Sequence, residues 1–200
     1  VGNKVIAVKA TSYDETVRIY ALDNSDIGPG NEETDWVLLK ELKAPATKSQ
    51  YIANFTVVGD KLFFSYRTFF DVVPPSDELW VCDGTVAGTK MLKTFPWQNS
   101  VGADMRQFFA FQNTLFFRNG VAAANSLWTS DGTVAGTVKF HDVKMALPGY
   151  EQPVPILVTE NKFYFSSEAN DLWSSDGTAA GTKLMIGLED AQTTSRCRDI

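Results

Sequence analysis

The chain has few of the side chains on which enzymes and metal sites most often depend. Its 200 residues include one histidine, His141, and two cysteines, Cys82 and Cys197. No HExxH, CxxC, P-loop or GxSxG pattern occurs, and no known motif ties a serine or cysteine nucleophile to His141. We therefore expect no metal site and a protein that is not an enzyme.

Basic side chains are also scarce. The chain has 18 lysines and arginines against 24 aspartates and glutamates, a formal net charge of −6, and a pI near 4.8. Nucleic-acid binding relies on clustered Lys and Arg, so this balance argues against a nucleic-acid partner. No apolar run approaches the roughly 18 residues that a membrane-spanning helix needs, and we expect no membrane span.

What the sequence has instead is one segment that occurs three times. Leu-Trp-x-x-Asp-Gly-Thr-x-Ala-Gly-Thr spans residues 79–89, 127–137 and 172–182. Its aspartates, Asp83, Asp131 and Asp176, are 48 and 45 residues apart. A period of this length is typical of stacked supersecondary units, and propeller blades are the leading interpretation.

Around each copy the sequence predicts short strands separated by turns, with no helical periodicity. In the second unit we expect strands at 51–58, 61–66, 78–82 and 89–95. In the third unit they lie at 106–111, 114–118, 126–130 and 137–141. In the fourth unit they lie at 155–159, 162–166, 171–175 and 182–186.

The N-terminal residues align with these units only from the second strand onward. Residues 2–7 match 59–64, and residues 16–23 match the third strand, with Tyr20 in the tryptophan position. Residues 36–42 match the fourth strand. The first unit therefore lacks a first strand. The C-terminal residues 195–200 could supply it, because a strand from the other terminus removes an open sheet edge.

We therefore predict an all-β fold, a four-bladed antiparallel β-propeller in one domain over residues 1–200. Its blades comprise residues 1–43 with 195–200, 51–95, 105–143 and 154–188. The alternative is a fragment of a longer propeller or repeat array. In the closed ring Cys82 and Cys197 belong to different blades, so we expect free thiols or a bond to another chain. The chain begins at Val1 without an apolar leader, so we expect a mature or excised form.

The three copies resemble the Glu-Leu-Trp-x-x-Asp-Gly-Thr-x-Ala-Gly-Thr repeats of large secreted or surface-attached proteins, mostly bacterial. The resemblance covers about three of the four units. It implies propeller-like packing and a secreted or extracellular location, and it implies no activity. The expected ring size is also similar to that of hemopexin-type domains, but only as architecture, which carries no function.

The repeated residues are best explained by structure. The carboxylates of Asp83, Asp131 and Asp176 can accept hydrogen bonds from amides of their own turns, and the following glycine tolerates positive φ. A ring of metal-binding carboxylates is the alternative, but a calcium loop needs more oxygen ligands than Thr-Val-Ala-Gly-Thr offers. The repeated tryptophans and the Phe-rich second strands are expected to pack between blades. At 12% of the chain, aromatic residues could also line a cavity for an apolar ligand.

The candidate binding residues lie where the units differ. One end of the predicted blades carries uniform turns, whereas the loops at the other end vary in length and composition, as recognition loops do. Aromatic and arginine side chains are good anchors for a ligand. In or next to these loops the candidates are Arg67, Phe69, Phe70, Trp97, Arg106, Tyr150 and Arg196.

We expect a secreted, non-enzymatic recognition module that binds a glycan or a protein through this variable face. The alternative is a carrier for an apolar small molecule, such as a pigment or lipid, in an aromatic cavity or at the subunit interface of a homo-oligomer. A propeller hydrolase comes third, because carboxylates can act without a linear motif. The sequence names neither the ligand nor a cofactor.

Overall fold

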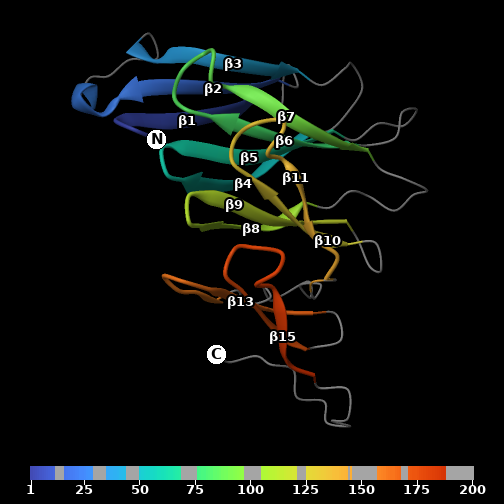
Figure 1. The fold of residues 1–200 in the computed structure, drawn as a ribbon. Coiled ribbons are helices and arrows are strands. Elements are labelled where there is room, and N and C mark those ends of the chain that lie inside the picture. Colours follow the sequence, from blue (N-terminus) through green and yellow to red (C-terminus); the bar gives the residue numbers. More distant parts are fainter. Residues whose placement is uncertain are drawn as a thin grey trace. The chain divides into compact units, whose positions relative to one another are not determined.

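The structure, a computed structural model, describes residues 1–11, 16–28, 35–43, 50–68, 76–96, 105–120, 125–143, 145, 157–167 and 171–187. These residues form four antiparallel sheets and one short 3₁₀ turn, η1 (Asn24–Asp26), with no α-helix in these ranges (Figure 1). The expectation of an all-β, antiparallel chain is confirmed. Within the described ranges no helix is long and apolar enough to cross a membrane.

Contacts divide the chain into two compact units, and the first consists of Val1–Ala103 with Gly132–Val134. It holds two sheets. The first sheet is ordered β1 (Lys4–Thr11), β2 (Thr16–Asp23) and β3 (Val37–Lys43). The second sheet is ordered β4 (Gln50–Val58), β5 (Lys61–Thr68), β6 (Ser76–Cys82) and β7 (Lys90–Pro96).

The second unit consists of Asp104–Asp131 with Ala135–Ile200 and holds the other two sheets. The third sheet contains β8 (Arg106–Phe111), β9 (Thr114–Asn119), β10 (Ser126–Ser130) and β11 (Val138–His141). The fourth sheet contains β12 (Leu157–Val158), β13 (Phe163–Ser166), β14 (Leu172–Ser175) and β15 (Lys183–Ile186). The predicted closing strand, residues 195–200, lies outside the described residues.

All four sheets share an irregularity that fixes their alignment. The pairing of the third strand with the fourth shifts register immediately before one aromatic residue in every sheet. That residue is Tyr20, Trp80, Trp128 or Trp173. Tyr20 therefore occupies the tryptophan position of the first unit, as the sequence predicts.

Stacked aromatic pairs form the centre of three sheets. Phe64 lies directly opposite Trp80 in the β5–β6 register, and their rings stack with centroids 6.2 Å apart. The same stacked pair recurs as Phe117 with Trp128 and as Phe165 with Trp173, at 6.4 Å in both cases. The phenylalanines of these pairs are at most 1% exposed, so the Phe-rich strands belong to the core.

Each unit has an apolar core made by both of its sheets. In the first unit Ile19 and Leu39 pack in one cluster with Phe64, Trp80 and Cys82. In the second unit the cluster includes Phe116 and Leu127 of the third sheet and Phe163 of the fourth. The ring of Phe116 lies 5.0 Å from that of Phe163, centroid to centroid. Neighbouring sheets within each unit are thus joined face to face by apolar side chains.

Candidate functional site

The repeated Asp-Gly-Thr turn is held together by its own side chains. In the second sheet the Asp83 carboxylate accepts hydrogen bonds from the Thr85 backbone N–H at 2.9 Å and the Thr85 hydroxyl at 2.7 Å. The Thr85 hydroxyl oxygen in turn accepts a bond from the Gly88 N–H at 2.9 Å. In the fourth sheet Asp176 and Thr178 make the same bonds at the same distances.

These bonds also affect the carboxylates. The Thr85 hydroxyl bond, followed by the Thr85 backbone bond, lowers the pKa of Asp83 below its ordinary value. The hydroxyl and backbone bonds from Thr178 lower the pKa of Asp176 in the same way. A carboxylate that already accepts several bonds favours its charged form within the turn. No group of three or more His, Cys, Asp or Glu side chains suited to a metal occurs in the ranges that the structure describes.

The glycine at the end of each turn is required because the carboxylate of the turn's aspartate lies where a Cβ would be. A Cβ added to Gly88 would lie 1.9 Å from Asp83 Oδ1, and one added to Gly181 would lie 2.0 Å from Asp176 Oδ1. The corresponding distance from Gly136 to Asp131 Oδ1 is 2.2 Å. Real Cβ contacts are never this short, so the Asp and the final Gly of the motif form one packing unit.

The opposite end of the sheets, which carries the variable loops, departs from the repeat. In the first sheet the pairs at this end are Val8 with Ile19 and Ala10 with Val17. In the second sheet the pairs at the corresponding positions are Ser65 with Leu79 and Arg67 with Asp77. Three apolar positions of the first sheet are thus polar in the second. Packing alone does not account for polar residues at positions that are apolar in a like unit, so these positions are candidates for a function.

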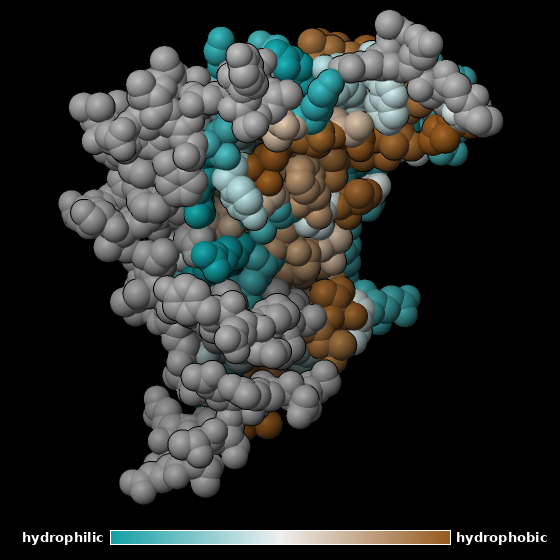
Figure 2. Space-filling model, turned by 180° about the vertical axis from the view of Figure 1, so that it is seen from behind, coloured by the Kyte–Doolittle hydropathy of each residue, from teal (hydrophilic) through white to brown (hydrophobic). Residues whose placement is uncertain are grey.

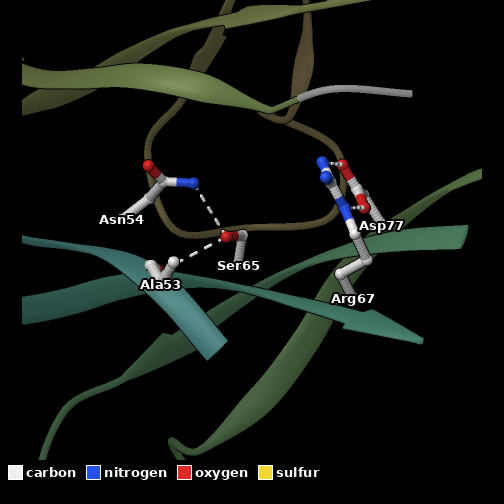
Figure 3. A network of polar contacts seen from close by, with 5 residues as sticks. All are labelled: Ala53, Asn54, Ser65, Arg67 and Asp77. Carbon is white, nitrogen blue, oxygen red and sulfur yellow. Dashed lines mark hydrogen bonds and ion pairs between the residues drawn. The ribbon is translucent and has the colours of Figure 1, made fainter. Parts of the chain in front are cut away.

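Arg67 and Asp77 form an ion pair across β5 and β6 (Figure 3). The Arg67 Nη2 donates to Asp77 Oδ2 at 2.6 Å, and its Nε donates to Oδ1. The side chain of Asp77 is 1% exposed and that of Arg67 is 18% exposed. A bidentate pair of this kind holds the guanidinium rigidly at the loop-bearing end of the sheet.

A second polar contact lies beside this pair on β4 and β5 (Figure 3). The register of β4 shifts between Ala53 and Thr56, and Asn54 has φ of +58°. Its side chain donates from Nδ2 to the Ser65 hydroxyl at 2.9 Å, and that hydroxyl donates to the Ala53 carbonyl at 3.2 Å. At Asn54, the backbone with positive φ therefore occurs together with a side-chain amide that is hydrogen-bonded to the neighbouring strand.

The third sheet has the same backbone irregularity with different side chains. The register of β8 shifts between Arg106 and Phe109, and Gln107 has φ of +55°. Arg118 takes the place of Ser65, because Arg106 pairs with Arg118 as Ala53 pairs with Ser65. Arg118 is 1% exposed and donates from Nη1 to the Gly120 carbonyl at 2.8 Å. A buried guanidinium therefore stands where the second sheet has a hydroxyl.

Two of the predicted binding residues can be located. Arg67 is held by Asp77, and Arg106 is exposed on the edge strand β8. The other five lie outside the described residues: Phe69, Phe70, Trp97, Tyr150 and Arg196.

Sequence reasoning missed Asn54, Asp77, Gln107 and Arg118 as members of this end of the sheets. Aligning the units strand by strand could have found Asp77 and Arg118, because both replace apolar or small residues of another unit.

No protein-family model matches the chain, and no curated protein matches it. Among solved structures it is similar to a prolyl endopeptidase, studied for the role of inter-domain dynamics in catalysis and specificity, with TM-score 0.37 and 14% identity. That match covers 92% of this chain and 26% of the other. The computationally designed Ika8 protein is similar with TM-score 0.29 and 12% identity, over 92% of this chain and 58% of that one. The chain thus spans about a quarter of the endopeptidase.

Proposed function

We propose that the chain is a secreted, non-enzymatic recognition module, built as a four-bladed propeller, that binds a glycan or a protein through its variable loop face. The observation that carries this proposal is the contrast between the two ends of the sheets. One end repeats the same self-bonded turn. The other end has apolar pairs in the first sheet and different polar side chains in the second and third sheets.

The chemistry of the variable end suits recognition. Arginine is enriched at binding hot spots, and a guanidinium that is already positioned loses less freedom when a ligand arrives. Arg67 is positioned by Asp77, and Arg106 is exposed on an edge strand. The aromatic candidates Trp97 and Tyr150, in the predicted loops of the same face, would supply stacking surfaces for a sugar ring or an aromatic side chain.

Binding to an oligosaccharide array and capture of protein partners test this function. We expect the wild-type protein to bind a defined glycan or protein, and the variants Trp97→Ala and Tyr150→Ala to lose that binding. Val86→Ser is the matched control, because Val86 is 60% exposed on a repeated turn. Absence of any glycan or protein ligand for the wild type would contradict the proposal.

A carrier for an apolar small molecule is the second candidate, and exposed apolar side chains on β4 favour it. Tyr51, Phe55 and Val57 are 59%, 47% and 55% exposed. Figure 2 shows apolar surface on the side of the molecule that faces away from the viewer in Figure 1. Exposed apolar side chains on an uncharged strand such as β4 are suited to an apolar ligand.

Native mass spectrometry and absorption spectroscopy separate these two functions. A carrier purified with its ligand has a mass above that of the bare chain, and a pigment adds an absorption band beyond those of the protein. A colourless preparation with the mass of the bare chain, or of a bare homo-oligomer, would leave recognition as the function.

A further inference from the structure

The third sheet contains a buried side-chain amide, that of Gln107, which makes no hydrogen bond to the described residues. Gln107 lies on the edge strand β8 with φ of +55°, a conformation that L-residues rarely adopt. Its Nε2 and Oε1 are both buried, and neither has a hydrogen-bond partner among the described residues. Burying an unbonded amide and straining its backbone both reduce stability, so the arrangement calls for an explanation.

The second sheet shows what the same irregularity looks like when it is purely structural. Asn54 has nearly the same backbone angle, φ of +58°, at the corresponding register shift. Its amide, however, is bonded to Ser65 on the neighbouring strand. Gln107 has Arg118 at that neighbouring position. The irregularity is therefore repeated, and what differs is that the amide in the third sheet has no hydrogen-bond partner among the described residues.

The groups around Gln107 indicate which kind of ligand could bind there. Its amide presents an acceptor oxygen and a donor nitrogen side by side. On the adjacent strand the guanidinium of Arg118 is buried and donates to the Gly120 carbonyl. A hydroxyl group both donates and accepts, so two neighbouring hydroxyls satisfy both ends of one amide. A bare anion would leave the Gln107 carbonyl oxygen without a hydrogen-bond donor.

The position is also within reach of solvent. Gln107 as a whole is half-buried rather than buried, and Arg106 before it is exposed. A rotation of the side chain would bring the amide to the surface of the edge strand. Arg106, one of the candidates on the variable face, then lies next to the same ligand.

We propose that Gln107, with Arg106 and Arg118 beside it, binds a pair of adjacent hydroxyl groups of a sugar. This inference rests on the proposed recognition function and deepens it, because it names a carbohydrate as the ligand. Gln107 supplies the donor and acceptor pair.

The variant Gln107→Gly tests the inference, with Asn54→Gly as its matched control. Glycine adopts φ near +55° freely, so Gln107→Gly should fold and melt at or above the wild-type temperature, because no protein hydrogen bond is lost. Asn54→Gly removes the bond to Ser65 and should melt lower. On an array of neutral and acidic oligosaccharides, we expect Gln107→Gly to bind the wild-type glycan about tenfold or more weakly, and Asn54→Gly to bind it unchanged.

Each other outcome overturns the inference, and the outcomes separate it from the proposed function. If the wild type and Gln107→Gly bind one glycan equally, the sugar site at Gln107 is wrong, while glycan recognition stands. If the wild type binds a purified protein and no glycan, the sugar inference is wrong and protein recognition stands. If it binds neither, both proposals fail. A water molecule on the Gln107 amide in a crystal structure of the glycan complex would mean that the site is only structural.

Discussion

Cys82 and Thr89 are joined by a hydrogen bond of 3.2 Å between the thiol and the hydroxyl, at the base of the Asp-Gly-Thr turn. The third and fourth sheets join two hydroxyls at the same place, Ser130 with Thr137 at 2.8 Å and Ser175 with Thr182 at 2.9 Å. Cys82 is fully buried and also accepts a bond from the Gly84 N–H at 3.3 Å. The thiol therefore takes the role of a serine hydroxyl.

The effect of replacing Cys82 on stability should depend on whether the new side chain can make the same hydrogen bonds. We expect Cys82→Ser to change the free energy of unfolding by less than about 1 kcal/mol, because the hydroxyl makes the same bonds. Cys82→Val should cost about 1–3 kcal/mol, since it leaves the Gly84 N–H without its acceptor. Urea denaturation of both variants is the measurement. Equal stability of the two would show that the hydrogen bonds contribute nothing.

Gly88 should be intolerant of a methyl group. A Cβ at this position overlaps the Asp83 carboxylate, so Gly88→Ala must displace it and break the bonds from Thr85. We expect a cost of about 1–3 kcal/mol in thermal or urea unfolding.

Gly28→Ala is the control, because nothing lies within 4 Å of its added Cβ, and it should change stability by less than about 0.5 kcal/mol. In an Asp83→Ala background the cost of Gly88→Ala should shrink. An unchanged cost in that background would mean that the carboxylate is not the obstacle.

Breaking the Arg67–Asp77 pair should cost far more stability than breaking a surface pair. Arg67→Met leaves the Asp77 carboxylate, 1% exposed, without its counter-charge, and we expect a loss of about 3–5 kcal/mol. Arg67→Met with Asp77→Leu should recover much of that loss. The matched control is Arg18–Glu41, also a cross-strand pair but with side chains 26% and 46% exposed, where Arg18→Met should cost about 0–1 kcal/mol. Similar losses in the two sheets would contradict the burial argument.

Acid should weaken the repeated turns. The pKa values of Asp83 and Asp176 are lowered in the folded protein, chiefly by the threonine hydroxyl bonds. Their stabilising effect is therefore complete above the ordinary value of 3.8 and is lost as the pH falls below it. We expect the melting temperature to decrease when the pH is lowered below about 4. In a variant with Asp83→Asn and Asp176→Asn, the melting temperature should decrease less over the same pH range. Identical acid profiles for the variant and the wild type would rule out these carboxylates as the cause.

The repeat explains why the strands could be predicted so closely. Three copies of one motif locate the third strand of each unit, and the strands around it follow from alternation and turn residues. The degenerate first unit was harder, yet Tyr20 lies at the register shift shared with Trp80, Trp128 and Trp173. The same alignment also places Cys82 level with Ser130 and Ser175, a relation visible in the sequence.

The polar end of the sheets could not be predicted in the same way. Positive φ at Asn54 and Gln107 depends on how each edge strand pairs. Asn is enriched at positive φ but Gln is not, so residue type alone does not predict the shared irregularity. The burial of Arg118 and the pairing of Arg67 with Asp77 likewise depend on cross-strand neighbours and on what covers them. Aligning the units marks Asp77 and Arg118 as departures from the repeat, but it predicts neither their burial nor their partners.

The proposed binding face depends on one arrangement, because loops of different sheets form a common face only if the sheets close into a ring. Removing residues 195–200, the proposed closing strand, is the most direct test. If they complete the first sheet, their loss exposes the edge of β1 and should cost several kcal/mol of a total of roughly 5–15. We expect the melting temperature to fall by about 10 °C or more. A truncated protein that melts at the temperature of the full chain would contradict the closed ring of four sheets.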